Sequence, residues 1–246
     1  ISQLPKSRLP KSPRLKSRRL KSPQWTHPPP SNPRTEMNRL LNAWYMFLKK
    51  PLNFGSRLLL LIGAALVAAA IFFPLWRVHL VAPQYQEGLE MIIYSYKFEG
   101  GHDGQDLKEI NMLNHYIGMK TVSAADFIEM QVIPFMFGLF VLLSLRAAVF
   151  GQMSAVVDLL VLTLYFGIFS AGSFVYRLYT YGHNLDPSAP MNIEPFMPVV
   201  IGTQQVANFT QSSYPEMGTY LVCIFVLLLV LAIWFSRKEQ LLPLPS

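Results

Sequence analysis

Four long apolar stretches constrain the fold of this 246-residue sequence more than any other feature. They cover, approximately, residues 58–80, 132–150, 155–175 and 220–235. A helix of about 20 apolar residues crosses a hydrocarbon core of about 30 Å, so each stretch is close to the length of a membrane span. The second is interrupted by Pro134 and closed by Arg146. We therefore expect an all-α integral membrane protein, with four transmembrane helices in residues 57–236 and two long structured extracytoplasmic loops.

The basic charge of the chain is concentrated at its N-terminus. The net charge is +7, but residues 1–36 hold nine Lys and Arg against one acid, Glu36. The rest of the chain holds 12 bases and 13 acids and is close to neutral. Residues 1–36 repeat a Leu-Pro-Lys-Ser pattern and end in a proline cluster, so they cannot bury enough apolar surface to fold. We expect this tail to be disordered.

Two interpretations of the tail remain open. It could touch anionic lipid headgroups, where each base near the surface contributes about 1 kcal/mol. Alternatively, it is a non-native extension upstream of a natural start at Met37. Nucleic-acid binding would rest on this tail alone, so we expect no nucleic-acid partner. The following residues, 37–56, combine Trp44 and Tyr45 with lysines and are typical of an amphipathic helix at a membrane interface.

The basic residues that flank the apolar stretches predict the orientation. They are Arg39, Lys49, Lys50 and Arg57 before the first, Arg146 between the second and third, and Arg237 and Lys238 after the fourth. With four alternating helices these positions share one side, which the positive-inside rule assigns to the cytoplasm. Both termini, including the tail 237–246, are then cytoplasmic. The loops 81–131 and 177–216 face outward.

We expect the first outer loop to contain local structure, because loops of this length are usually functional or folded. Residues 89–98 are rich in Ile and Tyr and predict a short strand or hairpin. Residues 106–119 predict a helix, with Asp106 as the N-cap and Glu109 completing a capping box.

One face of this predicted helix carries soft metal ligands. Met112, His115 and Met119 lie at helical spacing, and two thioethers with an imidazole favour Cu(I). His102 lies just upstream, and His183 lies in the second outer loop, so both are further candidates for the same copper site. The alternative is that the methionines pack the loop against the spans while His115 makes an ordinary hydrogen bond.

The second outer loop contains four prolines between residues 187 and 198, which predict an extended and stiff path. A short helix could begin at Thr203. Within the apolar stretches, Asp158 lies near the inner end of the third, and Arg146 lies across a short connection from it. We expect these two to form an ion pair at the membrane interface, with a proton or ion path as the alternative. Cys223 is interpreted as a small apolar filler.

The sequence resembles a known family at four segments, APQYQEGL, DLKEINMLNHYIGM, YGHNLDPSAPM and IGTQQVANFTQSSYP. The family comprises small four-span bacterial membrane proteins encoded near genes for nitrous-oxide reductase maturation and copper handling. The resemblance covers most of residues 70–235. It implies a location in the bacterial inner membrane and an accessory role, with copper and an extracytoplasmic protein partner, in the assembly or copper supply of an enzyme such as nitrous-oxide reductase.

Three classes of function follow. The first is the non-catalytic accessory protein just described. The second is a subunit of a respiratory complex that binds quinol or haem, but haem b would need histidines within the spans and only His79 comes close. The third is a small transport permease, which the apolar spans disfavour. The sequence offers no arrangement of nucleophile, base and orienting group, so we expect no enzymatic activity.

Overall fold

The computed structural model describes residues 33–191, 193–206 and 208–239. The chain divides into two units, residues 1–41 and 42–246, and each is considered by itself. Disorder was expected for residues 1–36, and residues 1–32 of this tail lie outside the described residues. Residues 33–36 are instead the first turn of α1 (Pro33–Leu48).

Helix α1 begins in the first unit and ends in the second. The amphipathic helix was expected in residues 37–56, whereas α1 begins before that range, at Pro33, and ends within it, at Leu48. Its apolar side chains are largely exposed, with Trp44 at 61%. The location of this helix at a membrane surface stays a prediction.

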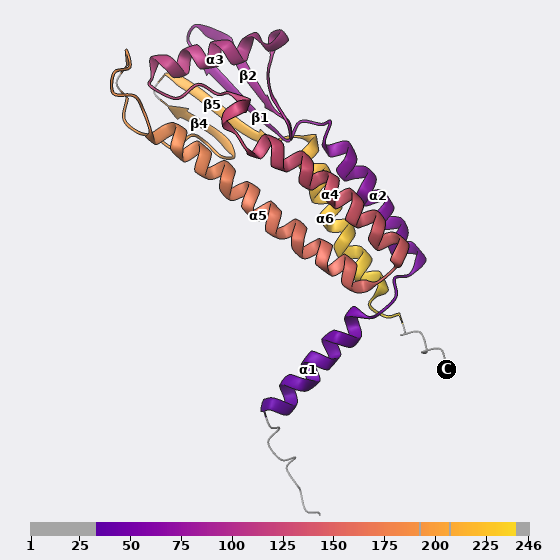
Figure 1. The fold of residues 1–246 in the computed structure, drawn as a ribbon. Helices are drawn as coiled ribbons and strands as arrows, with labels where there is room; N and C mark the ends of the chain where they lie inside the picture. Colours follow the sequence, from indigo (N-terminus) through magenta and orange to yellow (C-terminus); the bar gives the residue numbers. More distant parts are fainter. Residues whose placement is uncertain (1–32, 192, 207, 240–246) are drawn as a thin grey trace, which may run out of the picture. The chain divides into compact units, whose positions relative to one another are not determined.

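Four apolar helices form the bundle of the second unit (Figure 1). They are α2 (Phe54–Ala70), α4 (Glu129–Phe150), α5 (Met153–His183) and α6 (Met217–Ser236). In the described part of the chain, α4, α5 and α6 are long and apolar enough to span a membrane, whereas α2 has only 17 residues. The expectation of four full-length spans is wrong for the first of them.

The first predicted span is divided between a helix and a strand. Helix α2 ends at Ala70, Pro74 lies in the connection, and β1 (Trp76–Ala82) follows. Proline has no N–H to continue a helix and forces the residue before it into extended backbone. The apolar residues after Pro74 therefore belong to a sheet, and the boundary predicted at Leu80 is wrong.

The bundle is packed closely where α2 meets α6. Gly63 lets the ring of Phe225 approach so closely that a Cβ at residue 63 would lie 2.9 Å from a ring carbon. The ends of these helices are joined by hydroxyl groups. Ser236 Oγ donates to Ser56 Oγ at 2.8 Å, and Ser56 Oγ donates to the Ala232 carbonyl oxygen at 2.8 Å. Small and hydroxyl-bearing residues are typical of helix contacts inside membranes.

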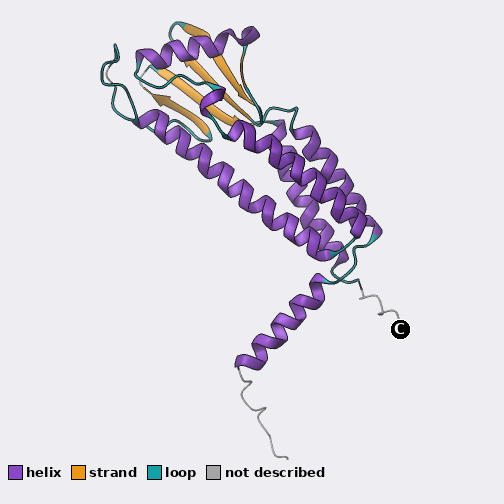
Figure 2. Ribbon diagram, viewed as in Figure 1, coloured by secondary structure: helices purple, strands orange, loops and turns teal. Residues whose placement is uncertain are grey.

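An antiparallel sheet stands at one end of the bundle (Figure 2). In the described residues it has five strands in the order β3-β2-β1-β5-β4, namely β3 (Phe98–Gly100), β2 (Tyr85–Ile93), β1, β5 (Phe209–Pro215) and β4 (Gly202–Val206). The all-α prediction is therefore wrong. The central strand β1 pairs with β2, its neighbour in sequence, and with β5, more than 120 residues further along the chain.

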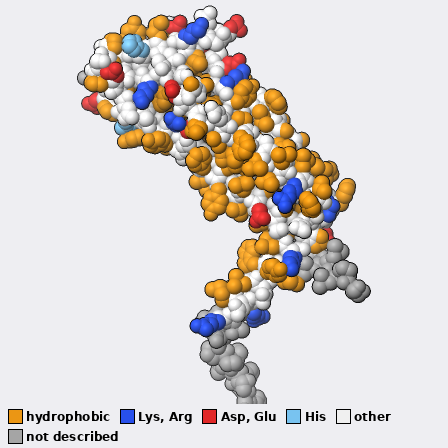
Figure 3. Space-filling view, viewed as in Figure 1, with side chains coloured by type: hydrophobic (Ala, Val, Ile, Leu, Met, Phe, Trp, Pro, Cys, Tyr) orange, Lys and Arg blue, Asp and Glu red, His pale blue; other side chains and the backbone are white. Residues whose placement is uncertain are grey.

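The two faces of the sheet differ in chemistry. Because side chains alternate along a strand, Val78 and Leu80 of β1 share one face with Met91 of β2. This inner face is apolar and turns toward the helices. The opposite face carries Arg77, which pairs with Glu90 at 3.3 Å and with Glu216 at 2.7 Å. In Figure 3, charged and histidine side chains gather over the sheet end, while hydrophobic side chains cover the bundle.

Helix α3 (Gln105–Tyr116) packs on the inner face, where Ile110 and Leu113 form a small buried cluster with Leu89. The helix expected at 106–119 is thus present but ends earlier. The capping box is wrong, because the N-cap is Gly104 in a left-handed conformation. Asp106 instead accepts a hydrogen bond from the backbone N–H of Glu90 at 2.9 Å, and Glu109 accepts one from the Tyr85 hydroxyl.

The second outer segment crosses from α5 to the sheet. The extended path predicted between residues 187 and 198 is wrong at its start, where the Ala189 N–H donates to the Asp186 carbonyl oxygen at 3.1 Å in a turn, while residues 193–199 form neither helix nor strand. The short helix proposed at Thr203 is wrong, since this residue lies in β4. On either side of Pro187 and Pro190, the Asp186 N–H donates to the Gly118 carbonyl oxygen at 2.8 Å and the Met191 N–H to that of Tyr116 at 2.9 Å. These bonds dock the segment on the end of α3.

Candidate functional site

An apolar cavity of about 220 Å³ lies beneath the inner face of the sheet. Its walls are the sheet, α3, the ends of α4 and α5 that approach the sheet, and the proline segment with Phe196 and Pro198. Leu, Ile, Val, Met and Phe make up most of the lining. The space exceeds the ~150 Å³ of an engineered apolar cavity that stays dry and binds benzene. It is therefore large enough for an organic molecule.

One ion pair is set into this wall. Arg177 of α5 donates from Nε and Nη2 to the two carboxylate oxygens of Glu129 of α4, each at 3.1 Å. The Ser173 hydroxyl donates to the same carboxylate. Such a two-point contact between guanidinium and carboxylate is among the stronger charge-assisted hydrogen bonds. These are the only charged residues lining the cavity in the described chain, so their charges cancel within the wall.

Aromatic rings hold the ion pair in place. The guanidinium carbon of Arg177 lies 5.0 Å from the ring centre of Phe127, which stacks on Tyr181 at 6.0 Å and meets Phe98 edge-on at 4.9 Å. The Tyr181 hydroxyl donates to the Thr121 carbonyl oxygen at 3.2 Å. This cluster, comprising Phe98, Phe127, Arg177 and Tyr181, joins β3, the segment before α4, and the end of α5.

Three uncharged polar side chains in the wall have spare hydrogen-bonding capacity. The buried hydroxyl oxygen of Ser170 has no partner among the described residues. The side-chain amide of Gln211, on the inner face of β5, enters none of the side-chain hydrogen bonds found in the described chain. Asn114 uses its amide N–H toward the Lys120 carbonyl oxygen at 3.4 Å, which leaves its own amide oxygen as an acceptor. A polar group inside the cavity would find partners here.

A second cavity, of about 150 Å³, lies next to the first, within the bundle. It is lined by α4, α5 and α6, and it shares Ile133 and Ser170 with the first cavity. Deeper lining residues include Gly167 and Thr163 of α5. The two spaces therefore adjoin at Ser170 and follow one face of α5.

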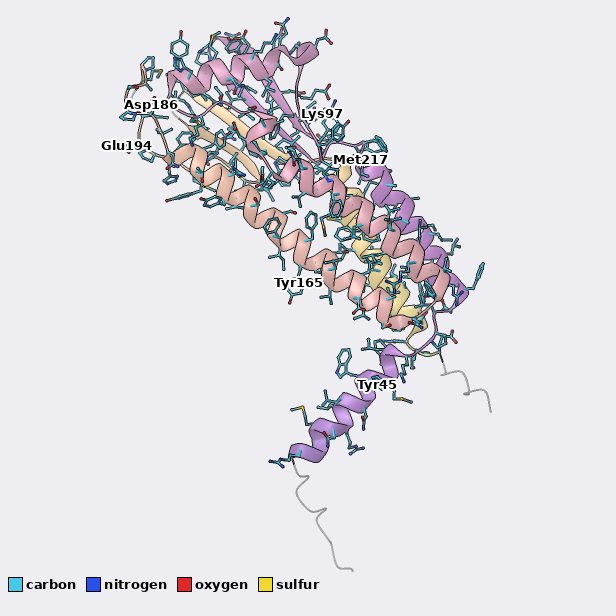
Figure 4. All side chains as sticks on the ribbon, in the orientation of Figure 1. Tyr45, Lys97, Tyr165, Asp186, Glu194 and Met217 are labelled. Atoms are coloured by element: carbon cyan, nitrogen blue, oxygen red, sulfur yellow. The ribbon has the colours of Figure 1, made fainter. Side chains whose placement is uncertain are left out.

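The predicted copper ligands do not share one face in the structure. Met112 is exposed at 53%, whereas Met119, beyond the end of α3, lines the cavity. His115 lies on the exposed side of α3, close enough to Asp186 to influence it. The hydroxyl and N–H of Ser188, at 2.7 and 2.9 Å, lower the pKa of Asp186, and His115 acts in the same direction. Figure 4 labels Asp186 in the segment beyond α5.

The two remaining histidine candidates have other partners. His183 donates from Nδ1 to the Tyr179 carbonyl oxygen at 3.0 Å and stacks on the Tyr179 ring at 3.9 Å. His102 lies 2.9 Å from the buried carboxylate of Asp106, which raises the pKa of the imidazole. Among the described residues no group of three or more His, Cys, Asp or Glu is arranged to hold a metal ion. Copper binding stays a prediction.

The predicted ion pair between Arg146 and Asp158 does not form in the structure. Arg146 lies over the ring of Phe150 at 5.8 Å, Asp158 is exposed, and the ion pairs within the described ranges do not include this one. Cys223 is an exposed free cysteine of α6. The pair that does form, Arg177 with Glu129, was missed because its members lie 48 residues apart and match no motif.

No protein-family model, curated protein or solved structure matches the chain. The cavity and its wall are therefore the basis of the functional argument that follows.

Proposed function

We propose that this chain is a membrane protein that binds an apolar, lipid-like molecule in the cavity beneath its sheet. The observation that carries the proposal is the cavity itself, about 220 Å³ and lined mainly by aliphatic and aromatic side chains. Ligand sites are usually concave and mostly apolar, with a few polar groups that fix orientation. A cavity of this kind at the end of membrane-length helices favours ligands that arrive from a bilayer. The proposed role is binding, without catalysis.

The proposal includes an orientation. The basic flanks Lys49, Lys50, Arg237 and Lys238 favour a cytoplasmic location for the ends of α2 and α6 near them. The sheet, at the opposite end of the bundle, would then lie on the outer side of a bacterial inner membrane, with both termini inside. A ligand in the cavity would be held at the outer membrane surface, where a protein partner could receive it.

A copper accessory role remains a separate prediction from the sequence. The bonds between the 186–191 segment and the end of α3 support it in part, because they bring His115 beside Asp186. The separation of Met112 from Met119 argues against a shared thioether site. We therefore rank lipid binding first.

Filling the cavity tests the proposal. The full chain, purified in detergent, is irradiated with a diazirine-bearing hexadecanol, and labelled peptides are mapped by mass spectrometry. We expect labels on peptides of β1, α3 and α5 that line the cavity. Val78→Phe, which fills the space from the inner face, should remove most of the labelling. Val81→Phe, on the opposite face of the same strand, is the matched control. Labelling confined to the outer surface of the bundle and unchanged by Val78→Phe would contradict the proposal.

A further inference from the structure

The charge balance of the wall restricts what the cavity can hold. Arg177 donates two hydrogen bonds of 3.1 Å to the Glu129 carboxylate, and the Ser173 hydroxyl donates a third. An ionised headgroup would enter without a counter-charge, and burying an unpaired ion is costly. The cavity therefore favours an uncharged molecule.

The unpartnered polar atoms locate the headgroup. Ser170 Oγ is buried where the two cavities adjoin, and Gln211 and Asn114 lie in the wall of the first cavity. A buried polar atom without a partner is unfavourable, and a ligand hydroxyl or carbonyl would satisfy it. Such a headgroup would lie on the sheet side of Ser170.

The second cavity gives the direction of the apolar part. Along α5 the lining of the two cavities together runs from Tyr181 to Thr163, about 27 Å at 1.5 Å per residue, and the second cavity, from Ser170 to Thr163, accounts for about 10 Å of it. The two cavities together are longer than one bilayer leaflet, about half of the ~30 Å hydrocarbon core, whereas the second cavity alone is shorter. A compact molecule beside Ser170 would leave much of the combined length empty, whereas an elongated molecule with a hydrocarbon chain would follow it.

The route of entry is the wall formed by α5. Gly167 lines the second cavity and is itself exposed, and a Cβ built there meets nothing within 4 Å. Tyr165, labelled in Figure 4, projects from the same helix at 71% exposure. The second cavity is therefore accessible from the side of the bundle, where lipid would lie.

We infer that the ligand is a neutral lipid, with a hydrogen-bonding headgroup beside Ser170, Gln211 and Asn114 and a long chain between α4, α5 and α6. This inference rests on the proposed lipid-binding function and adds the charge, polarity and placement of the ligand. It distinguishes the site from one for phospholipids with a net charge or for free fatty-acid anions.

Two probes with the same hydrocarbon chain and different headgroups test the inference. The full chain is reconstituted in phosphatidylcholine nanodiscs and irradiated with diazirine-bearing hexadecanol or with the equivalent hexadecyl sulfate, which is anionic at every usable pH. We expect the alcohol to label the cavity at least about 10-fold more than the sulfate, because the sulfate would be buried without a counter-charge. Equal labelling of the cavity by both probes would overturn the inference but leave the proposed function standing. Labelling of the cavity by neither would overturn both.

Two variants make the result specific. Ser170→Ala should weaken labelling by the alcohol about 2- to 10-fold, the effect of one lost hydrogen bond, while Ser154→Ala on the same helix should not. Glu129→Gln leaves the charge of Arg177 unbalanced and should raise labelling by the sulfate several-fold. An unchanged preference for the alcohol in folded Glu129→Gln protein would overturn the argument from charge.

Discussion

The bundle and the sheet region differ most in how completely their interiors are filled. In the described chain, the buried core of the bundle has 14 residues, among them Phe140, Phe225 and Leu229 at 1% exposure or less. The buried cluster beneath the sheet has only three, and a cavity of about 220 Å³ lies beside it. Close packing maximises stability, whereas an unfilled apolar space forfeits contacts. The comparison assigns stability to the bundle and binding to the sheet region.

The largest expected effect on stability comes from crowding the bundle. Gly63→Leu forces a side chain into the ring of Phe225, so we expect a loss of about 3 kcal/mol, the upper end of the range for overpacking. Thermal unfolding of the purified protein in one detergent measures it. Gly167→Leu is the counterpart in the cavity and should leave stability nearly unchanged while blocking probe binding. Gly172→Leu, exposed and with nothing near its Cβ, is the control for both.

The comparison would be broken if the two leucine substitutions destabilised the protein equally. The space next to Gly63 and the space next to Gly167 would then be equally filled.

A smaller effect is expected from the ion pair that closes the cavity wall. Arg177→Met leaves the carboxylate of Glu129, whose side chain is only 16% exposed, without its cation. We expect a loss of about 2–3 kcal/mol, below the 3–5 kcal/mol of fully buried pairs because Arg177 is 31% exposed. Adding Glu129→Gln should recover most of it. Chemical unfolding of the single and double variants measures the coupling, and equal stability of all four proteins would show that the pair contributes nothing.

The hydroxyl contacts between α2 and α6 should contribute less. Ser56→Ala removes the donor to the Ala232 carbonyl oxygen and the acceptor for Ser236. Hydrogen bonds between membrane helices contribute about 0.6 to 1.7 kcal/mol, so we expect a loss of about 1 kcal/mol. The same unfolding assay measures it, with Ser154→Ala as the control. Probe labelling of the cavity should not change.

The smallest effect is a pH dependence of the sheet region. Asp106 raises the pKa of His102 in the folded protein above its value of about 6.5 in an unfolded chain. The stabilisation is therefore fully present below about pH 6.5 and is lost as the pH rises through the folded pKa. Hydrogen exchange of the α3 amides, followed from pH 5.5 to 8.5 after correction for the intrinsic rate, should show this loss. His102→Gln should abolish it, and the amides of α6 should not show it.

The sequence predicted the parts of the fold that depend on local pattern. Helices α4 and α6 correspond to the apolar runs predicted at 132–150 and 220–235, and α3 follows from its stripe of Ile110 and Leu113. Of the sheet, the sequence predicted only the strand or hairpin in residues 89–98, where β2 pairs with β3. The rest was missed because β1 pairs with β5, more than 120 residues away, and no local signal reports such a pairing. Strand β1 also lies in the same apolar run as α2, so the sequence predicted one long helix for the whole run.

The site was predicted only in fragments. Met119 was identified from its spacing but was assigned to a metal, whereas it lines an apolar cavity. Glu129, Ser170 and Arg177 were not singled out, because each is unremarkable within its own segment. Their role depends on the approach of α4 to α5 beneath the sheet, which is a property of the tertiary structure.

The central claim is that the space beneath the sheet holds a lipid chain that continues into the bundle. An electron cryomicroscopy map of the full chain in nanodiscs made with its native membrane lipids tests it most directly, with a bound antibody fragment to add mass. The account predicts elongated density that begins near Gln211, passes Ser170 and ends near Thr163, and that disappears in Gly167→Leu. A cavity filled by the protein's own side chains, or by separate water molecules, would contradict it.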